Sequence, residues 1–516
     1  MSKSDGPGSR DAPRVVKNAG DTANASNADN ADNAAEADHP ENAAARALDN
    51  PVERRGASKT DLSDRRRAIQ RRVMLTVPRL RQLGMRGREL SRKLRGEPHR
   101  IEFYHQVDDP YSHLALEAIG DLLDRYEVEC RFFLVSQTDL KHAPEPTLLG
   151  QYALRDCALV AEDYGLTFPK SGEAAAGTAK ASDATSSLPA RETVERVEAL
   201  LARLVGDPCF RDVALEAGRA LWSADKAELE KIEARTPTAT AGERQSTIAD
   251  GNARRTRKQH YSGGMFWYAG EWFWGVDRLH HLERRLGKLG AARTQDTQLR
   301  FDRPPIDPGK NANAGRLRLE VFPSLRSPYT AMIFDRTLEM AASVDVPVTL
   351  RPVLPMVMRG VPAPFAKGIY IMSDAKREAD QLGVPFGDMF DPIGRPVERG
   401  LSLWPFARDE GRGAEFISAF LRAAFAEGRN TGSDEGIRSV VEDAGLSFAA
   451  AKAHLDSNDW RAEIEENRKV MYDELGLWGV PSYRLVSENN PDEADFSVWG
   501  QDRLWRVAAE IRRRLA

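Results

Sequence analysis

The sequence predicts an α/β chain built from two tandem copies of one domain, because three of its stretches recur in the same order. The clearest pair is 101–115 (IEFYHQVDDPYSHLA) and 317–331 (LRLEVFPSLRSPYTA). Each stretch reads as an alternating apolar strand that runs into a helix start carrying Pro-Tyr. Ordered self-similarity of this kind indicates a duplicated domain of roughly 190–200 residues. The other two pairs are 148–170 with 365–387 and 271–286 with 496–515.

Low-complexity segments separate these landmarks and set the predicted boundaries. Residues 170–190 and 233–259 are rich in Ala, Thr, Ser and Gly, so we expect them to be loops that interrupt the first copy. The first domain is therefore placed at 100–288 and the second at 316–516, with a linker at 289–315.

The elements of the second copy follow a recognisable order. A strand, a helix and another strand come first, a long amphipathic helical section follows, and two short strands and a last helix close the copy. This is the order of a thioredoxin fold with a large helical insertion in its middle. The expected elements are strands at 317–323, 346–354, 479–486 and 496–499, and helices at 328–343, 413–428, 434–445, 448–455 and from 501 onward.

The start of the chain differs in composition from both copies. Residues 1–60 are rich in Ala, Asn, Asp and Gly and contain no apolar signal-peptide core, so we expect a disordered arm. Residues 61–99 are strongly basic, with leucines at roughly helical spacing around Pro78, which predicts a partly helical lead-in. A basic amphipathic helix can make weak contact with an anionic surface, and a plain solvated lead-in is the alternative.

Composition excludes several classes of protein. The 74 Lys and Arg residues nearly balance the 78 Asp and Glu residues, so the whole chain does not resemble a nucleic-acid binder. Cys130, Cys157 and Cys209 are widely spaced, which argues against a dithiol redox centre and a disulfide scaffold and fits a cytoplasmic protein. His280 and His281 have no other ligand nearby in sequence, so we expect no metal. We also expect no transmembrane helix, because no apolar run approaches eighteen residues.

Four motifs of the second copy carry a family resemblance: SPYT at 327–330, LGVPF at 382–386, LGLWGVPSYRL at 475–485 and WGQDRL at 499–504. With them, the second copy resembles the kappa-class glutathione transferase and 2-hydroxychromene-2-carboxylate isomerase family, a branch of the DsbA-like thioredoxin superfamily. The first copy is similar to a smaller extent, mainly through DPYSHLA at 109–115.

The resemblance implies a glutathione site in the second copy. Ser327 would hydrogen-bond the glutathione sulfur, and Val480 with a cis Pro481 would lie along the cysteinyl backbone of the tripeptide. Gln501 and Asp502, at the start of the last helix, would receive its γ-glutamyl end. The family commonly has a lysine and an asparagine where this chain reads PVLPMVMRGVPAPFAKG, and this departure bears on the substrate.

Two arginines near the expected site suit carboxylates. Arg326 and Arg359 are candidates for binding a glutathione carboxylate or an acidic substrate, since a guanidinium can pair with a carboxylate through two hydrogen bonds.

Ser327 also has a purely structural interpretation. Serine followed by proline is preferred at a helix start, where the hydroxyl caps the free amides, so this pair can be a cap and nothing more. The same helix terminus favours a thiolate over a thiol, which supports the functional interpretation. In the first copy Asp109 replaces the serine and Gly264 replaces the proline, so this copy is predicted to keep the fold and to have lost glutathione activation. The alternatives for its role are that it packs against the second copy, supplies part of the pocket of the second copy, or binds a different ligand.

The sequence thus favours a glutathione-dependent isomerase or transferase acting on an aromatic or conjugated carbonyl compound. The second hypothesis is a catalytically silent tandem thioredoxin-fold module that binds a ligand or a protein. A DsbA-like oxidoreductase is the third, and it is disfavoured because neither strand-helix corner carries a cysteine.

Overall fold

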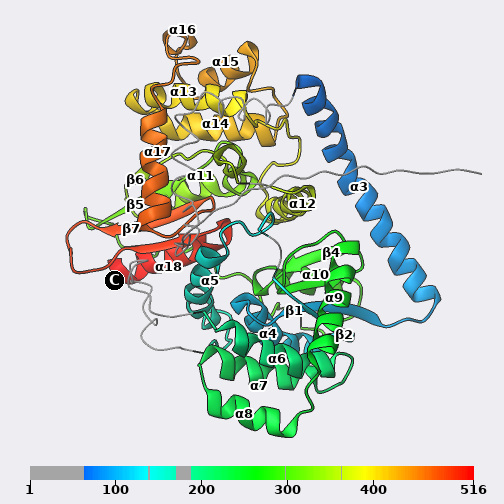
Figure 1. Cartoon of the computed structure of the whole chain (residues 1–516). Coiled ribbons are helices and arrows are strands. Elements are labelled where there is room, and N and C mark those ends of the chain that lie inside the picture. The colour runs from blue at the N-terminus through cyan, green and yellow to red at the C-terminus, as the bar shows by residue number, and fades with distance from the viewer. Residues whose placement is uncertain (1–62, 138–139, 170–187, 297, 362) are drawn as a thin grey trace, which may run out of the picture. The chain divides into compact units, whose positions relative to one another are not determined.

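Two four-stranded sheets with the same topology organise the chain (Figure 1). The computed structural model describes residues 63–137, 140–169, 188–296, 298–361 and 363–516. One sheet belongs to residues 99–288, called the first region below, and the other to residues 317–515, called the second region. The disorder predicted for residues 1–60 and most of the loop predicted at 170–190 lie outside the described residues.

In the first region the strand order is β2-β1-β3-β4. The first two strands are parallel, and the other pairs are antiparallel. Its elements are His99–Gln106 (β1), Pro110–Arg125 (α4), Val128–Val135 (β2), Pro146–Ala161 (α5), Arg191–Leu204 (α6), Phe210–Trp222 (α7), Lys226–Arg235 (α8), Ala241–Arg257 (α9), Met265–Tyr268 (β3), Glu271–Trp274 (β4), the 3-10 turn Val276–Arg278 (η1) and Leu279–Lys288 (α10).

The second region repeats this order as β6-β5-β7-β8, with the same strand directions. Its elements are Leu317–Phe322 (β5), Pro328–Ala342 (α11), Val348–Leu350 (β6), Met356–Arg359 (η2), Phe365–Leu382 (α12), Arg395–Asp409 (α13), Gly413–Phe425 (α14), Asp434–Asp443 (α15), Phe448–Ala451 (α16), Arg461–Lys469 (α17), Val470–Glu474 (η3), Ser482–Ser487 (β7), Phe496–Trp499 (β8), Gln501–Arg503 (η4) and Leu504–Leu515 (α18).

The predicted fold class is confirmed: the chain is α/β, with two sheets and a large helical section inserted in each region. Two predicted elements are shorter than expected. The strand expected at 346–354 is assigned only over Val348–Leu350, although the Arg351 and Val353 amides go on to donate to the carbonyl oxygens of Val321 and Pro323. The helix expected at 448–455 spans only Phe448–Ala451. The domain boundaries at 288 and 316 remain a prediction, because contacts group all the described residues into one compact unit.

One prediction was wrong. Residues 233–259 were expected to form a loop, but Ala241–Arg257 forms the helix α9. Its start is a capping box, in which the Thr240 hydroxyl accepts from the Glu243 amide and the Glu243 carboxylate accepts from the Thr240 amide. This reciprocal cap offsets the weak helix propensity of the Ser, Thr, Asn and Gly residues that follow.

The basic lead-in forms one long helix, Asp64–Leu94 (α3). Near its start, the Arg67 side chain donates to the carbonyl oxygens of Asp391 and Ile393, so this part of α3 is attached to the second region. Farther along, Leu83 and Leu90 are more than half exposed. The contact of this helix with an anionic surface stays a prediction.

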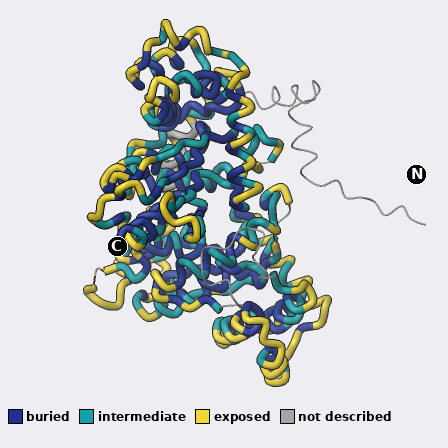
Figure 2. Tube along the Cα trace, turned by 90° about the vertical axis from the view of Figure 1, so that its left-hand side faces the viewer, coloured by how far each residue is buried: buried dark blue, intermediate teal, exposed yellow. Residues whose placement is uncertain are grey.

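The buried side chains form more than one core. Buried and exposed stretches alternate along the trace in Figure 2. In the first region the sheet and its helices share one cluster, in which the rings of Phe103 and Phe266 lie 4.8 Å apart. The second region has one cluster on its sheet and another among helices α13 to α15. The helical section therefore has a hydrophobic core of its own beside the sheet.

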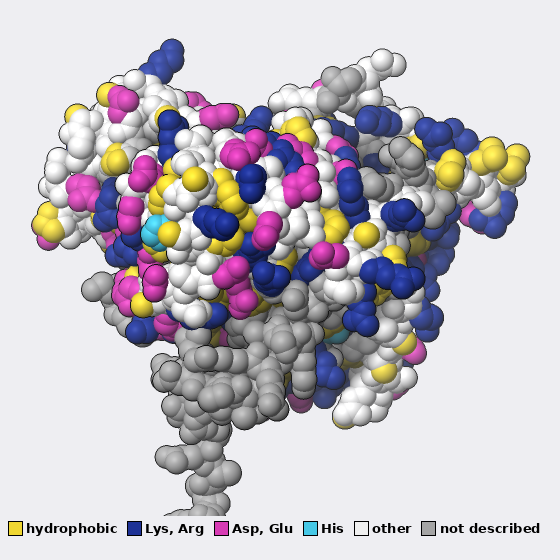
Figure 3. All heavy atoms as spheres, turned by 90° about the horizontal axis from the view of Figure 1, so that it is seen from above, with side chains coloured by type: hydrophobic (Ala, Val, Ile, Leu, Met, Phe, Trp, Pro, Cys, Tyr) yellow, Lys and Arg dark blue, Asp and Glu magenta, His cyan; other side chains and the backbone are white. Residues whose placement is uncertain are grey.

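The surface carries both signs of charge. On the face seen in Figure 3, Lys and Arg side chains lie among Asp and Glu side chains, as the net charge of −4 leads one to expect. Among the described helices, none combines the length and the hydropathy needed to cross a membrane.

Candidate functional site

Ser327 lies at the corner where β5 ends and α11 begins, and its hydroxyl makes two hydrogen bonds. It accepts from the Thr330 amide at 3.1 Å, which is the expected helix cap, and it donates to the Val480 carbonyl at 3.3 Å. The side chain is buried, with 7% of its surface exposed. The hydroxyl therefore joins the helix start to a segment 153 residues later in the chain.

The second side of this corner is the Val480-Pro481 peptide, which is cis, as the resemblance implied. The Pro481 carbonyl accepts from the Gly500 amide at 2.9 Å, so the turn that opens the last helix begins beside the proline. The structure thus brings together Ser327, Val480 and Pro481, three of the residues that the sequence predicted to act together.

Aromatic side chains from both regions cover this corner. Trp478 and Trp499 of the second region lie with ring centroids 5.2 Å apart, and Tyr152 of the first region lies 5.6 Å from Trp499. The Tyr152 hydroxyl also bonds the backbone amide and carbonyl of Trp499, at 2.9 Å each. Tyr152 packs in one cluster with Phe322 and Val480. The first region thus forms part of the wall of the candidate site.

Two basic side chains beside these aromatics extend the site. Arg359 donates to the Trp478 carbonyl at 3.0 Å, and burial lowers its pKa to about 10. Lys367, which the sequence reasoning missed, lies 5.5 Å from the Trp478 ring centroid and donates to the His142 carbonyl of the first region. Burial lowers the pKa of Lys367 to about 8. In the sequence, Lys367 was noticeable only as the lysine within PVLPMVMRGVPAPFAKG, the segment that departs from the family pattern.

The other predicted residues are engaged elsewhere. Arg326 pairs with Asp391 through two bonds of 2.8 and 3.0 Å. Gln501 is buried and donates to Glu378 at 2.9 Å. Neither side chain is seen to contact Ser327 or Val480, so their binding roles stay predictions.

Asp502 pairs with Arg278 of the first region at 2.7 Å. Burial opposes its ionisation, but the neighbouring arginines outweigh this effect and hold the pKa of Asp502 below its ordinary value. Arg278 is itself buried and also contacts Asp374 at 2.9 Å and Glu378 at 3.4 Å. The carboxylate that was predicted to receive a ligand amine thus already has a cationic partner.

An arginine of the second region likewise pairs with carboxylates of the first region. Arg503 of the second region contacts Asp156 at 2.6 Å and Asp277 at 2.8 Å, both of the first region. The Gly-x-Asp-Arg segments at 275–278 and 500–503 therefore pair reciprocally where the regions meet: the arginine of each segment contacts the aspartate of the other. Such reciprocal contacts are typical of isologous interfaces, in which two copies of one surface meet.

The equivalent corner of the first region differs as the sequence predicted. Asp109 caps α4 by accepting from the Tyr111 amide at 3.1 Å. Gly264 precedes β3 as Pro481 precedes β7, and a Cβ there would lie 3.0 Å from the Asp109 carboxylate. Burial, with a smaller contribution from Asp108, raises the pKa of Asp109 to about 7. This corner holds a carboxyl group that is about half ionised at neutral pH.

The raised pKa of Asp109 predicts a pH-dependent loss of stability that Asp109→Asn should remove. Below about pH 4 the carboxyl is protonated in the folded and the unfolded chain. Between about pH 4 and pH 7 only the folded chain holds the proton, so the free energy of unfolding falls as pH rises. Asparagine caps a helix equally well and does not titrate.

Urea unfolding of both proteins from pH 4 to pH 8 tests this prediction. The asparagine variant should gain stability relative to wild type across that window, by about 1–3 kcal/mol at the upper end. A difference between the two proteins that is the same at every pH contradicts it.

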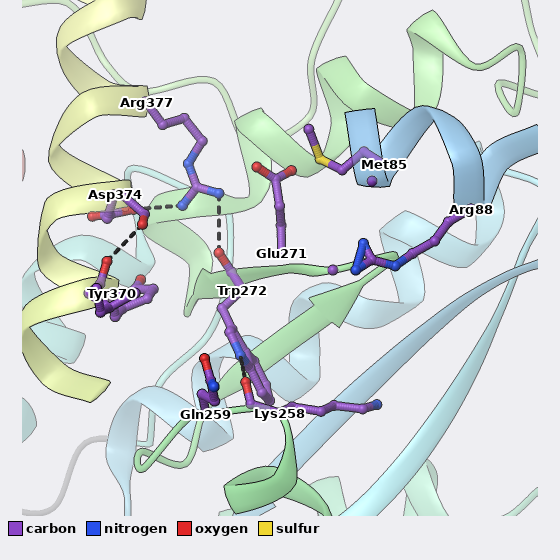
Figure 4. Close-up of a pocket in the computed structure, with 13 residues that line it drawn as sticks. Met85, Arg88, Lys258, Gln259, Glu271, Trp272, Tyr370, Asp374 and Arg377 are labelled. Atoms are coloured by element: carbon purple, nitrogen blue, oxygen red, sulfur yellow. Dashed lines mark hydrogen bonds and ion pairs between the residues drawn. The ribbon is translucent and has the colours of Figure 1, made fainter. Parts of the chain in front are cut away.

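A cavity of about 370 Å³ lies apart from the Ser327 corner. It is lined by α3, by β4 and by α12, with Arg88, Glu271, Trp272, Asp374 and Arg377 among its side chains (Figure 4). Ser327, Val480 and Pro481 are not among its lining residues.

Comparisons with known proteins agree with this description of the second region. The family model described as DSBA-like thioredoxin domain matches residues 318–512. A comparison with curated protein sequences finds no match.

Several solved structures resemble part of the chain. A 2-hydroxychromene-2-carboxylate isomerase is 19% identical; the match covers 38% of this chain and 95% of that one, with a TM-score of 0.31. The cytosolic disulfide reductase DsbM from Pseudomonas aeruginosa is 23% identical over 39% of this chain and 100% of its own, with a TM-score of 0.31. The structure of DsbM with GSH is 22% identical over 38% of this chain and 99% of its own, with a TM-score of 0.29.

The matched range begins inside β5, ends inside α18 and includes both the Ser327 cap and the cis Pro481 peptide. Residues 318–512 of this chain are a DsbA-like thioredoxin domain.

Proposed function

We propose that the second region is a glutathione-dependent isomerase or transferase domain that acts on an aromatic or conjugated carbonyl compound. The observation that supports it best is the contact between the Ser327 hydroxyl and the Val480 carbonyl beside the cis Pro481 peptide. In this arrangement a hydroxyl donor, a helix N-terminus and an extended backbone segment lie together without a protein thiol.

Each part of the corner has a role in the proposed binding. The Ser327 hydroxyl would turn from the Val480 carbonyl to donate to the glutathione sulfur, and the start of α11 would add its partial positive charge. A charge-assisted hydrogen bond can supply the roughly 1.4 kcal/mol that lowers a thiol pKa by one unit. The backbone of Val480 and Pro481 would align the tripeptide, and Gln501, Asp502 and Arg326 would reach its termini by releasing part of their present pairs.

The proposed isomerisation needs no change of oxidation state. The glutathione thiolate adds to the conjugated carbon, so a C–S bond forms and the electron pair of the C=C bond moves to the carbonyl oxygen as an enolate. Rotation about the resulting single bond follows. The enolate then re-forms the C=O and C=C bonds and expels the thiolate, which restores glutathione. Nearby cationic groups such as Arg359 and Lys367 would stabilise the enolate.

We further propose that the two regions are tandem copies and that the first copy supports the second. The identical strand order and the equivalent positions of Gly264 and Pro481 support duplication. The first region lacks both the serine and the proline at its corner, while its Tyr152 bonds the Trp499 backbone at the other corner.

The second candidate function is a catalytically silent binding module, and the position of Tyr152 favours it. This ring is 5% exposed and packs with Phe322 and Val480, where a bound tripeptide would need space. An oxidoreductase acting through its own thiols has less support, because Ser327 and Asp109 occupy the two helix starts.

Ser327→Ala should weaken thiol activation. The pKa of the bound glutathione thiol should rise by about one unit, because the variant lacks the hydroxyl donor, and glutathione affinity at neutral pH should fall about tenfold. Calorimetric titration with glutathione, combined with the ultraviolet absorbance of the thiolate against pH, measures both quantities.

Ser433→Ala is the matched control, because Ser433 caps α15 by accepting from the Gly436 amide at 3.0 Å and belongs to another helix start. Both variants should lose about 1 kcal/mol of stability from the missing cap. Only Ser327→Ala should lose glutathione affinity. Binding by wild type that is unchanged in Ser327→Ala would exclude the role of the hydroxyl, and no binding by wild type would favour the silent module.

A further inference from the structure

Helices α10 and α12 bring two histidines and a glutamate together where the two regions meet (Figure 1). The His281 Nε2 lies 2.6 Å from Oε1 of Glu378, and the His280 Nε2 lies 3.7 Å from the same oxygen. One ligand atom from each residue lies within 4.8 Å of the others. No sequence pattern indicates this group, because Glu378 is 97 residues from His281 and belongs to the other region.

His280 is buried without a hydrogen-bond partner. Its exposed fraction is 0%, and neither ring nitrogen bonds any group of the described chain. Native structures rarely leave a buried polar atom unpaired without a reason, because such an atom has lost its hydrogen bonds to water. Its Nε2 is close enough to the Glu378 carboxylate to share a bound ion, but too far away for a hydrogen bond.

The buried charges around this group do not balance. Among the described residues, the ion pairs that include Glu378 connect to a network of four arginines and five carboxylates, so the carboxylates outnumber the arginines by one. The members are Arg278, Arg303, Arg377 and Arg503 with Asp156, Asp277, Asp374, Glu378 and Asp502.

Neutral imidazoles with a carboxylate are a donor set that suits zinc and similar divalent transition metals. Bonds of 2.0–2.2 Å in a tetrahedral site place the ligand atoms about 3.3 Å from one another. The distances of 2.6 and 3.7 Å to Glu378 lie on either side of that value, so small side-chain shifts suffice. The second carboxylate oxygen is held by Arg303 at 2.7 Å and by Gln501 at 2.9 Å, which fixes the orientation of the group.

We propose that His280, His281 and Glu378 bind one divalent transition-metal ion, zinc above all, that links the two regions. The ion adds positive charge where carboxylates outnumber arginines, and it gives the unpaired His280 nitrogen a partner. A bound proton is the alternative source of positive charge at this site. The metal content of the purified protein distinguishes a bound ion from a bound proton. This proposal does not depend on glutathione chemistry.

The test uses the full-length protein, purified from zinc-supplemented cells and also prepared metal-free by dialysis against a chelator. Mass spectrometry should find about one zinc per chain in the first preparation. Adding Zn²⁺ to the second should raise the melting temperature, and Co²⁺ should give the visible absorption bands of a four-coordinate site. Competition with a chromophoric chelator gives the affinity.

His280→Gln and Glu378→Gln should each weaken Zn²⁺ binding tenfold or more, by about the amount expected when a metal site loses a supporting group. His260→Gln is the matched control, because His260 is also buried with an unpartnered Nε2 but stacks on Tyr261 and packs at an angle against Trp272. This variant should bind Zn²⁺ like wild type. Absence of stoichiometric metal from wild type, or equal affinity in all four proteins, would overturn the proposal.

Discussion

Replacing Arg278 with methionine should destabilise the chain by about 3–5 kcal/mol, the largest effect that we predict for one side chain. Arg278 is the closest cationic partner of Asp502, at 2.7 Å, and it also contacts Asp374 and Glu378. Without it, buried carboxylates lose the group that compensates their desolvation. Because Asp502 belongs to the second region and Arg278 to the first, the loss should weaken the attachment between the two regions.

Urea unfolding followed by circular dichroism measures this effect. Arg512→Met is the matched control, since Arg512 and its partner Asp307 are each 53% exposed, and an exposed pair contributes at most about 1 kcal/mol. Asp502→Asn should restore part of the stability in the Arg278→Met background, because it removes the unpaired charge. Equal midpoints for Arg278→Met and Arg512→Met would mean that the cross-region network does not hold the regions together.

Gly479→Ala should disrupt the wall of the candidate site. A Cβ at residue 479 would lie 1.9 Å from the Trp499 ring, far inside van der Waals contact. The ring has little freedom to move, because it lies between Trp478 and Tyr152 and its backbone is bonded to the Tyr152 hydroxyl. We expect a loss of about 1–3 kcal/mol, as for other overpacked cores. If the proposed function is correct, glutathione affinity should fall with it.

Gly368→Ala provides the control for this substitution. Gly368 lies inside α12, and a Cβ there would meet nothing within 4 Å. Alanine should stabilise that helix by about 0.5–1 kcal/mol, because glycine is the weaker helix former. Thermal melting of both variants gives the comparison, and a Gly479→Ala protein as stable as wild type contradicts the packing argument.

Local patterns predicted the elements of the second region well. Ser327 and Pro328 specify a helix start through the hydroxyl cap and the fixed proline φ angle, and α11 begins there. The same reasoning applied to Thr240 and Glu243 would have found α9. The loop prediction for this segment was wrong because it followed the Ala, Thr and Gly content and not the capping box.

Contacts between distant residues could not be predicted in the same way. Asp502 was expected to face a ligand, but whether a carboxylate faces a ligand or an arginine depends on what packs against it. Tyr152 reaches the candidate site only because the two regions meet there, and the bond from Lys367 to the His142 carbonyl depends on the same contact. Both residues lie in the recurring stretches 148–170 and 365–387, but that repetition does not indicate which side chains face the site.

The sequence alone determined that the chain is α/β, that its two sheets share one order of elements, and that a serine and a Val-Pro peptide occupy the corner of the second region. Those features depend on short-range rules of periodicity, capping and proline geometry, which a linear sequence displays directly. Only the tertiary structure decided the partners of the buried charges and brought His280 and His281 to Glu378. These contacts depend on the packing of one region against the other, because a charge that is buried away from water is stable only beside a group of opposite sign.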